Sequence, residues 1–376
     1  MGKKKKAIVS VTNDLYTDNR VDKVCSFLVN QGYEVTLVGR LRKTSQPLPE
    51  RIYKTKRMKL SFDKGALFYA AFNFRLFWFL AFRKADLFVA NDLDTLLGNY
   101  AASKLKPKCR LVYDSHEYFT EVPELEGRKR VKRTWEGIES WIFPKLKTVY
   151  TVNESIAQLY EEKYKKKLFI VRNVSPKWNP QNIQSKQELG IPEHKTIIIL
   201  QGAGINIHRG AEEAVEAMKY IENAVLIFVG DGDVIPALKE SVIKENLEEK
   251  VLFFGKRPYQ EMMQFTYHAD IGLTLDKANN INYQFSLPNK VFDYIQAGTP
   301  IICTNLVEVS RIVIPHDVGE VMEEFNAFNL AEKINALVNN VGRLNQLKAN
   351  CEKAAFLENW EKECEILEEI YPKVDQ

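Results

Sequence analysis

The sequence predicts an α/β protein built from two doubly wound domains, and three observations support this prediction. Short apolar runs alternate with amphipathic stretches along most of the chain, as in βαβ units with a parallel sheet. This alternation stops once, between residues 175 and 194, at a polar segment that contains three prolines. A length of 376 residues also fits two domains better than one.

The polar segment sets the expected domain boundaries. We expect a first Rossmann-like domain over residues 1–176, a linker over 177–194, a second Rossmann-like domain over 195–355 and a final helical segment over 356–376. Each of the two domains is long enough to bury a hydrophobic core of its own.

Each expected strand is a short apolar run, and the helices between the strands carry apolar residues on one face. In the first domain we expect strands at 7–12, 33–38, 86–90, 111–113, 148–152 and 168–171, and helices at 20–31, at 130–143, from 95 and from 153. In the second we expect strands at 196–201, 224–229, 251–254, 271–275 and 301–304, and helices from 211, at 259–267, between 288 and 298, and at 356–371. Ligands bind at the carboxyl ends of such strands.

Composition narrows the classes of function. The formal net charge of +4 is small and there are no repeated basic–aromatic tracts, so nucleic acid is not an expected partner. The five cysteines are scattered, which is typical of reduced thiols in a cytoplasmic protein. The histidines lack metal-ligand spacing and no dinucleotide-binding glycine motif follows the first strand, so we expect neither a metal nor a cofactor.

Residues 66–82 are almost all apolar and form the one segment that suggests contact with a membrane. The segment is shorter than the ~20 residues that a spanning helix needs, and Asn73 and Arg75 lie at its centre. Lysines and arginines flank it on both sides, as they do beside anionic lipid. A core helix and a helix on a membrane surface are both consistent with this pattern.

The segment 283–300 predicts a loop that becomes a helix and then ends. Pro288 suits the helix start and Gly298 the helix end, while Ser286 and Asn289 can cap the free amide groups. Free amides and the positive end of a helix dipole favour the binding of phosphate.

Charged residues strengthen this expectation of an anion site. Lys290 supplies a cation at the helix start, and the Asp293 carboxylate, one turn further on, has the chemistry to take a pair of sugar hydroxyls. Arg209 lies in a glycine-rich turn that follows another strand of the same expected sheet. Each stretch by itself also fits an ordinary turn or a capped surface helix. The candidate anion-site residues are Gly202, Gly204, Arg209, Gly210, Lys256, Ser286, Asn289, Lys290 and Asp293.

Polar residues also follow the strands of the first domain. His116 and Glu117 come directly after a strand, where a histidine between acids can move protons or orient a sugar. Asp92 belongs to an Asx-rich turn after another strand, and Arg20 follows the loop after the first one. A structural role is the alternative interpretation of each.

Taken in order, these segments resemble the retaining glycosyltransferases of family 4, especially bacterial members that build surface polysaccharides. That family has the GT-B architecture, in which two Rossmann-like domains face a cleft and the last helix returns to the N-terminal domain. The resemblance runs nearly from end to end. The segments that resemble the family are 18–21, 32–35, 86–97, 113–117, 209–210, 269–271, 287–298 and 360–361.

The resemblance implies metal-independent transfer of a hexosyl-type sugar with retention, from a UDP- or GDP-type nucleotide-diphosphate sugar to a glycan or lipid-linked acceptor in polysaccharide biosynthesis. Arg209 and Lys290 would hold the diphosphate, Asp293 the ribose, and His116 the transferred sugar or the acceptor. The enzyme would be cytoplasmic, with peripheral contact to the inner face of the plasma membrane left open. The expected acceptor-side residues are Asn13, Asp14, Arg20, Asp92 and Glu117.

Phe285 stands where the family has the first of two glutamates eight residues apart. A phenylalanine cannot act as a carboxylate, so two alternatives stay open beside the transferase. One is a non-catalytic relative that binds nucleotide sugars or glycans, and the other is a sugar-nucleotide epimerase of the same fold.

Overall fold

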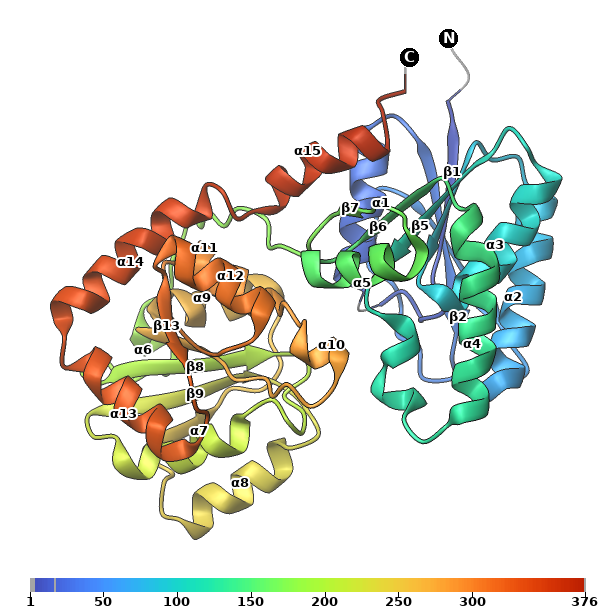
Figure 1. Cartoon of the computed structure of the whole chain (residues 1–376). Helices are drawn as coiled ribbons and strands as arrows, with labels where there is room; N and C mark the ends of the chain where they lie inside the picture. The colour runs from blue at the N-terminus through green and yellow to red at the C-terminus, as the bar shows by residue number, and fades with distance from the viewer. Residues whose placement is uncertain (1–3, 17, 375–376) are drawn as a thin grey trace. The chain divides into compact units, whose positions relative to one another are not determined.

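The computed structural model describes residues 4–16 and 18–374, and the chain divides into two compact units. The first unit comprises the chain up to Asn173 together with the segment from Glu363 onward, and the second runs from Val174 to Lys362. Figure 1 shows that each unit has strands at its centre and helices around them.

The first unit contains a parallel sheet, in the part that the structure describes, with strands in the order β3-β2-β1-β4-β5-β6-β7. The strand order reverses between β1 and β4, which is the switch point of doubly wound folds. The strands are β1 (Lys6–Ser10), β2 (Glu34–Leu41), β3 (Lys54–Lys59), β4 (Leu87–Asn91), β5 (Arg110–Ser115), β6 (Thr148–Thr151) and β7 (Phe169–Ile170). The α-helices are α1 (Asn19–Asn30), α2 (Gly65–Ala81), α3 (Leu93–Leu105), α4 (Lys129–Ile142) and α5 (Glu154–Tyr164).

One side of helix α2 packs against a face of this sheet. Phe68, Phe72, Leu76 and Leu80 recur every four residues and are buried in one cluster with residues of the strands. The polar Asn73 at its centre is satisfied, since its side chain donates to the Asp94 carbonyl oxygen at 2.7 Å. The buried half of α2 therefore agrees with the interpretation of this segment as a core helix.

The second unit repeats the same plan with a parallel sheet in the order β10-β9-β8-β11-β12-β13. Its strands are β8 (Thr196–Gly202), β9 (Ala224–Gly230), β10 (Val251–Phe253), β11 (Ile271–Thr274), β12 (Ile301–Thr304) and β13 (Gly319–Met322). Its α-helices are α6 (Lys186–Leu189), α7 (Ala211–Ala217), α8 (Ile235–Lys244), α9 (Tyr259–His268), α10 (Ile281–Gln284), α11 (Asn289–Ala297), α12 (Val307–His316), α13 (Ala327–Val338) and α14 (Val341–Ala355).

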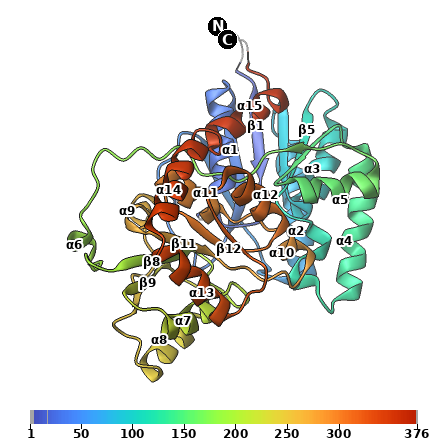
Figure 2. The same cartoon turned by 60° about the vertical axis from the view of Figure 1, so that its left-hand side comes forward.

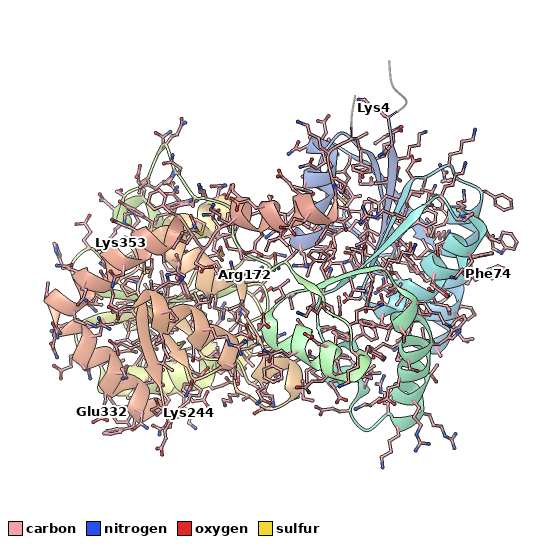
Figure 3. The ribbon with its side chains drawn as sticks, turned by 45° about the horizontal axis from the view of Figure 1, so that its top comes forward. Lys4, Phe74, Arg172, Lys244, Glu332 and Lys353 are labelled. Atoms are coloured by element: carbon pink, nitrogen blue, oxygen red, sulfur yellow. The ribbon has the colours of Figure 1, made fainter. Side chains whose placement is uncertain are left out.

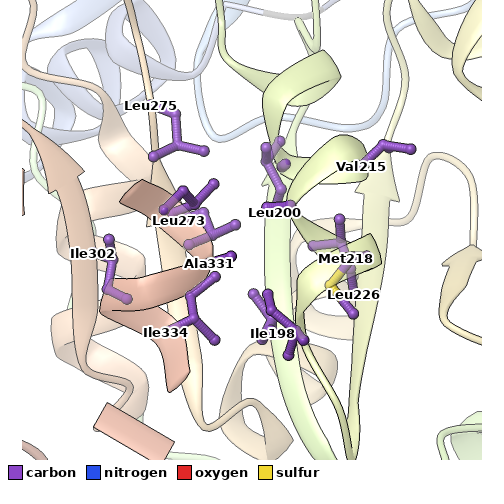
Figure 4. Packing of buried hydrophobic residues seen from close by; sticks show 14 of the residues in the cluster. Ile198, Leu200, Val215, Met218, Leu226, Leu273, Leu275, Ile302, Ala331 and Ile334 are labelled. Atoms are coloured by element: carbon purple, nitrogen blue, oxygen red, sulfur yellow. The ribbon is translucent and has the colours of Figure 1, made fainter. Parts of the chain in front are cut away.

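Helices cover both faces of this second sheet. Figures 1 and 2 both show α7 and α13 on one side and α9 and α11 on the other. On the first side, Ile198 and Leu200 of β8 pack with Met218 and with Ala331 and Ile334 of α13 (Figure 4). The buried β-strands are continuous apolar runs, as expected when both faces of a parallel sheet are covered.

The boundaries differ from the expected ones at two places. Residues 177–194, expected as a linker, are grouped with the second unit, and a capping box of Ser185 and Glu188 starts α6 there. The final helix does not begin at residue 356, because α14 ends at Ala355 and α15 (Trp360–Ile370) begins four residues after residue 356. Residues from Glu363 onward belong to the first unit.

Candidate functional site

The switch point of the second sheet brings two loops together. One follows β8 and spans residues 202–210; the other follows β11 and runs from residue 275 to helix α11. They touch directly, since the amide of Lys277 donates to the carbonyl oxygen of His208 at 3.0 Å. In open α/β sheets this is the position at which ligands bind.

Glycines allow the backbone of these loops to pass closely. Gly210 has a φ of 74°, and an added Cβ would lie 2.4 Å from the Cβ of Leu275. Gly230, at the end of β9, has no room either, because its missing Cβ would lie 1.8 Å from the carbonyl oxygen of Gly202. Gly202 and Gly204 have open space around them, with no other atom closer than 3.6 Å to an added Cβ. A ligand can therefore approach the backbone at Gly202 and Gly204.

Arg209 is held at this point by an acid and a ring. Its guanidinium forms an ion pair with Asp276 and lies 4.6 Å from the centre of the Tyr283 ring. Asp276 is buried, with 1% of its surface exposed, and it comes two residues after the end of β11. Neither Asp276 nor Tyr283 was among the expected site residues. Its place after a strand of the switch point is the signal that could have identified Asp276.

Lys290 lies in the first turn of α11 and completes the charge cluster. Burial lowers the pKa of the Lys290 ammonium, the charge of Asp276 opposes this change, and the charge of Arg209 adds to it. The two cations expected to hold a diphosphate are thus close enough to affect one another, and Asp276 partly neutralises them.

Helix α11 begins at Asn289 without a side-chain cap, so the expected capping by Ser286 and Asn289 is wrong. Pro288 takes the N-cap position, and the Ser286 hydroxyl instead lies 3.5 Å from the Asp276 carboxylate. Amides at a helix start that no side chain caps can donate to an anion, which adds to the capacity of this site for anions.

Asp293, expected to take ribose hydroxyls, is buried and hydrogen-bonded within the second unit. Its carboxylate accepts from the hydroxyls of Ser175 (2.6 Å) and Tyr259 (3.1 Å) and from the amide of Gln201 (3.1 Å). The structure therefore uses Asp293 to join α11 to β8 and α9. To bind a ribose, Asp293 would have to exchange one of these partners.

Lys256 lies apart from this cluster. It is exposed and follows β10, which is the edge strand of the sheet and is separated from β8 by β9. Its position explains why no contact joins it to Arg209 or Lys290 among the residues that the structure describes.

The first unit has a second charged cluster where β4 and β5 end. The ring nitrogens of His116 lie 3.3 Å from the Asp92 carboxylate and 3.2 Å from the Asp114 carboxylate. Burial disfavours the charged ring, but these two carboxylates outweigh it and raise the pKa of His116 to about 9. His116 is therefore a cation at neutral pH, with both nitrogens donating.

Two further acids of this cluster hold protons unusually tightly. Burial, with the charges of Asp92 and Glu124 adding to it, raises the pKa of Glu117 to about 8. Burial and the charge of Asp92 raise the pKa of Asp94 to about 7, and the Thr12 hydroxyl donates to this carboxylate at 2.5 Å. A histidine cation and acids that titrate near neutral pH are typical of functional sites.

Three expected acceptor-side residues have partners inside the first unit. Arg20 is buried and binds both oxygens of Asp114, at 2.8 and 3.2 Å. The Asn13 side chain donates to Asp18 at 2.6 Å, and the Asp14 carboxylate accepts from the Tyr16 amide at 3.1 Å. Arg20 thus holds the end of β5 from helix α1, and Asn13 and Asp14 hold the loop after β1, whereas Asp92 and Glu117 lie beside His116.

Comparison with known proteins decides the family. A model of the glycosyl transferases group 1 matches residues 181–355, and a model of glycosyltransferase family 4 matches residues 18–174. The chain belongs to the family 4-like glycosyltransferases of the GT-B fold. Both units of this glycosyltransferase are matched, so the resemblance and the fold class expected from the sequence are confirmed.

Solved structures of similar fold cover almost the whole chain. A glycosyltransferase from Rickettsia africae is 16% identical with a TM-score of 0.77, covering 98% of this chain and 98% of that one. A sucrose-phosphate synthase from Thermosynechococcus elongatus gives the same figures. HepE from Anabaena, solved with UDP and glucose, is 15% identical with a TM-score of 0.75, covering 98% of this chain and 100% of that one. No curated protein matches the sequence.

Proposed function

We propose that this glycosyltransferase moves a hexosyl-type sugar, with retention of anomeric configuration, from a nucleotide-diphosphate sugar to a glycan or lipid-linked acceptor. One observation carries the proposal. Arg209 and Lys290 gather beside the open glycine loop at the switch point of the second sheet. A cation in the first turn of a helix and a second cation from the facing loop are suited to a diphosphate that leaves with negative charge.

The relatives support a nucleotide sugar as the donor. HepE from Anabaena has been solved with UDP-glucose as well as with UDP and glucose. In the proposal Arg209 and Lys290 hold the diphosphate, and Gly202 and Gly204 allow it to approach the backbone. His116, Asp92 and Glu117 act on the acceptor side of the reaction.

Thermal unfolding with nucleoside diphosphates tests donor binding. We expect UDP or GDP to raise the melting temperature, and K290A and R209A to remove this rise. R209A leaves the buried Asp276 without its partner, so each variant is compared with its own melting temperature in the absence of nucleotide. K244A, on an exposed lysine of α8, is the matched control and should keep the rise. A wild type that no nucleoside diphosphate stabilises would contradict the proposal.

Turnover separates the enzyme from its alternatives. We expect transfer from a panel of sugar nucleotides to persist in EDTA, because protein cations neutralise the diphosphate, and to fall in H116A. NMR of the product should show the anomeric configuration of the donor. Binding without turnover would favour the non-catalytic relative, and conversion of the sugar nucleotide without an acceptor would favour the epimerase.

The outer face of α2 supports an acceptor at a membrane surface. Leu67, Phe74, Trp78 and Phe82 are exposed at helical spacing, with Phe82 exposed by 81%, and the Trp78 and Phe82 rings stack at 5.5 Å. Figure 3 shows Phe74 projecting outward from this helix. Among the described residues no helix is long and apolar enough to cross a membrane.

Basic residues surround this exposed aromatic face. Lys64 precedes α2, Arg83 and Lys84 follow it, and Arg75 lies beside Phe74; all four are exposed. Aromatic rings bordered by cations are suited to the interface of an anionic bilayer. We therefore assign the α2 face to peripheral contact with anionic lipid.

Vesicle sedimentation tests this assignment. We expect the protein to sediment with phosphatidylcholine vesicles that contain phosphatidylglycerol. With vesicles of pure phosphatidylcholine it should stay in the supernatant, since the cations require anionic lipid. The double variant F74S/F82S should lose binding. I243S, which removes an equally exposed apolar side chain from α8, should keep it. Equal binding by all three proteins would contradict the assignment.

A further inference from the structure

Asp276 combines burial with an incomplete set of hydrogen bonds. One oxygen of its carboxylate pairs with Arg209, while the other is buried and has no hydrogen-bond partner among the described residues. In the same part of the chain, the Nε of Arg209 is also buried and has no hydrogen-bond partner. Leaving such groups unsatisfied costs free energy, so buried polar atoms of this kind call for an explanation.

The backbone around Asp276 is fixed on both sides. The Thr304 hydroxyl donates to the Asp276 carbonyl oxygen at 2.7 Å, and the next amide, of Lys277, donates to His208. Lys277 also forms an ion pair with Glu213. The carboxylate is therefore held at the switch point by contacts that do not involve its own free oxygen, which is the arrangement of a preorganised binding group.

The position of Asp276 places it beside the proposed diphosphate cations. Arg209 is its direct partner, the charge of Asp276 acts on Lys290, and Ser286 lies 3.5 Å away. In a nucleotide sugar the transferred sugar is bonded directly to the diphosphate, so its hydroxyls come within reach of groups next to these cations. A sugar hydroxyl is the donor that the free oxygen of Asp276 lacks.

We propose that Asp276 is a catalytic carboxylate that accepts hydrogen bonds from the transferred sugar. This inference rests on the proposed function. In the reaction the bond between the anomeric carbon and the diphosphate oxygen breaks, and its electron pair leaves with the diphosphate. The acceptor oxygen forms the new bond, and its proton passes to the departing diphosphate. Asp276 forms no covalent bond; its negative charge stabilises the positive charge that develops on the sugar.

The same geometry gives Asp276 a second effect. When no donor substrate is bound, the negative charge of Asp276 offsets the positive charge of Arg209 and so reduces the repulsion between Arg209 and Lys290. A diphosphate has to compete with Asp276 for Arg209. Removing the charge of Asp276 should therefore slow transfer while the affinity for UDP stays the same or increases. A purely structural role would weaken both binding and transfer.

The test compares D276N with the wild type and with D270N, which changes an aspartate at the opposite end of β11. UDP and UDP-glucose are the probes, or GDP and GDP-mannose if only the guanine pair stabilises the wild type. We expect D276N to keep the melting-temperature rise with the diphosphate and to lose about a hundredfold in kcat. D270N should keep the kcat of the wild type.

Each other outcome has a defined meaning. If D276N loses both the melting-temperature rise with the diphosphate and its kcat, Asp276 only positions Arg209. If D276N keeps the kcat of the wild type, Asp276 does not face the sugar. Either of these two results overturns the inference. If D276N fails to fold, D276E keeps the carboxylate and should exceed D276S in turnover, and equal turnover overturns the inference. A wild type without binding or turnover would instead refute the proposed function itself.

Discussion

Replacing His116 with glutamine is expected to reduce stability most below pH 6.5 and progressively less as the pH rises through 9. The carboxylates of Asp92 and Asp114 raise the pKa of His116 from 6.5 to about 9 in the folded protein. The folded state therefore binds the proton more tightly than the unfolded state. Each change of one in pKa corresponds to 1.36 kcal/mol, so the charged ring contributes about 3 kcal/mol below pH 6.5.

Urea unfolding of wild type and H116Q at several pH values between 6 and 10 measures this contribution. The difference in unfolding free energy should be largest at pH 6 and should shrink toward pH 10, where the folded wild type has also lost the proton. H194Q, on an exposed histidine of the second unit, is the matched control and should show no such trend. A difference for H116Q that stays constant from pH 6 to 10 would refute the reasoning.

Three further predictions concern the backbone, the core and a helix cap, all measured by urea unfolding. Gly210→Ala should lower the unfolding free energy by more than about 1 kcal/mol, since φ is 74° and an added Cβ has no room. Gly137→Ala, where an added Cβ has open space within a helix, should raise the unfolding free energy by about 0.5–1 kcal/mol. A Gly210→Ala protein more stable than Gly137→Ala would contradict this prediction. Phe72→Ala should cost about 3–5 kcal/mol and Phe82→Ala less than about 0.5, because only Phe72 is buried; equal losses would contradict the assigned faces of α2. Asn153→Ala should lower the unfolding free energy by about 0.5–2 kcal/mol, because the N-terminal cap of α5 is lost. An unchanged unfolding free energy would show that this cap does not stabilise the protein.

The fold could be predicted where the sequence carries a hydrophobic period. Strand β12 was predicted with the observed bounds, because the apolar run 301–304 stands between a proline and a polar loop. Strand β3 was missed, since Lys54–Lys59 contains four basic residues and lies at the edge of its sheet, where little is buried. Strand β13 was missed because only Met322 of its four residues is buried.

The site was predicted where residue type alone determines chemistry. A cation at a helix start and a cation in a glycine turn led to Lys290 and Arg209, which the structure places close together. Asp276 was missed although it follows a strand of the switch point, because its pairing with Arg209 of another loop cannot be read from the sequence. The contacts of Asp293 were missed for the same reason, since Ser175 and Gln201 are distant in sequence.

The division of the chain into units also sets an order for synthesis. The second unit is continuous, whereas the first needs the residues from Glu363 onward, including Tyr371, whose hydroxyl lies 3.2 Å from that of Tyr150. A ribosome therefore produces every residue of the second unit before the first can be completed. Until these residues are made, the first unit lacks part of its own structure, and exposed apolar surface of this kind is what makes incompletely folded chains prone to aggregation.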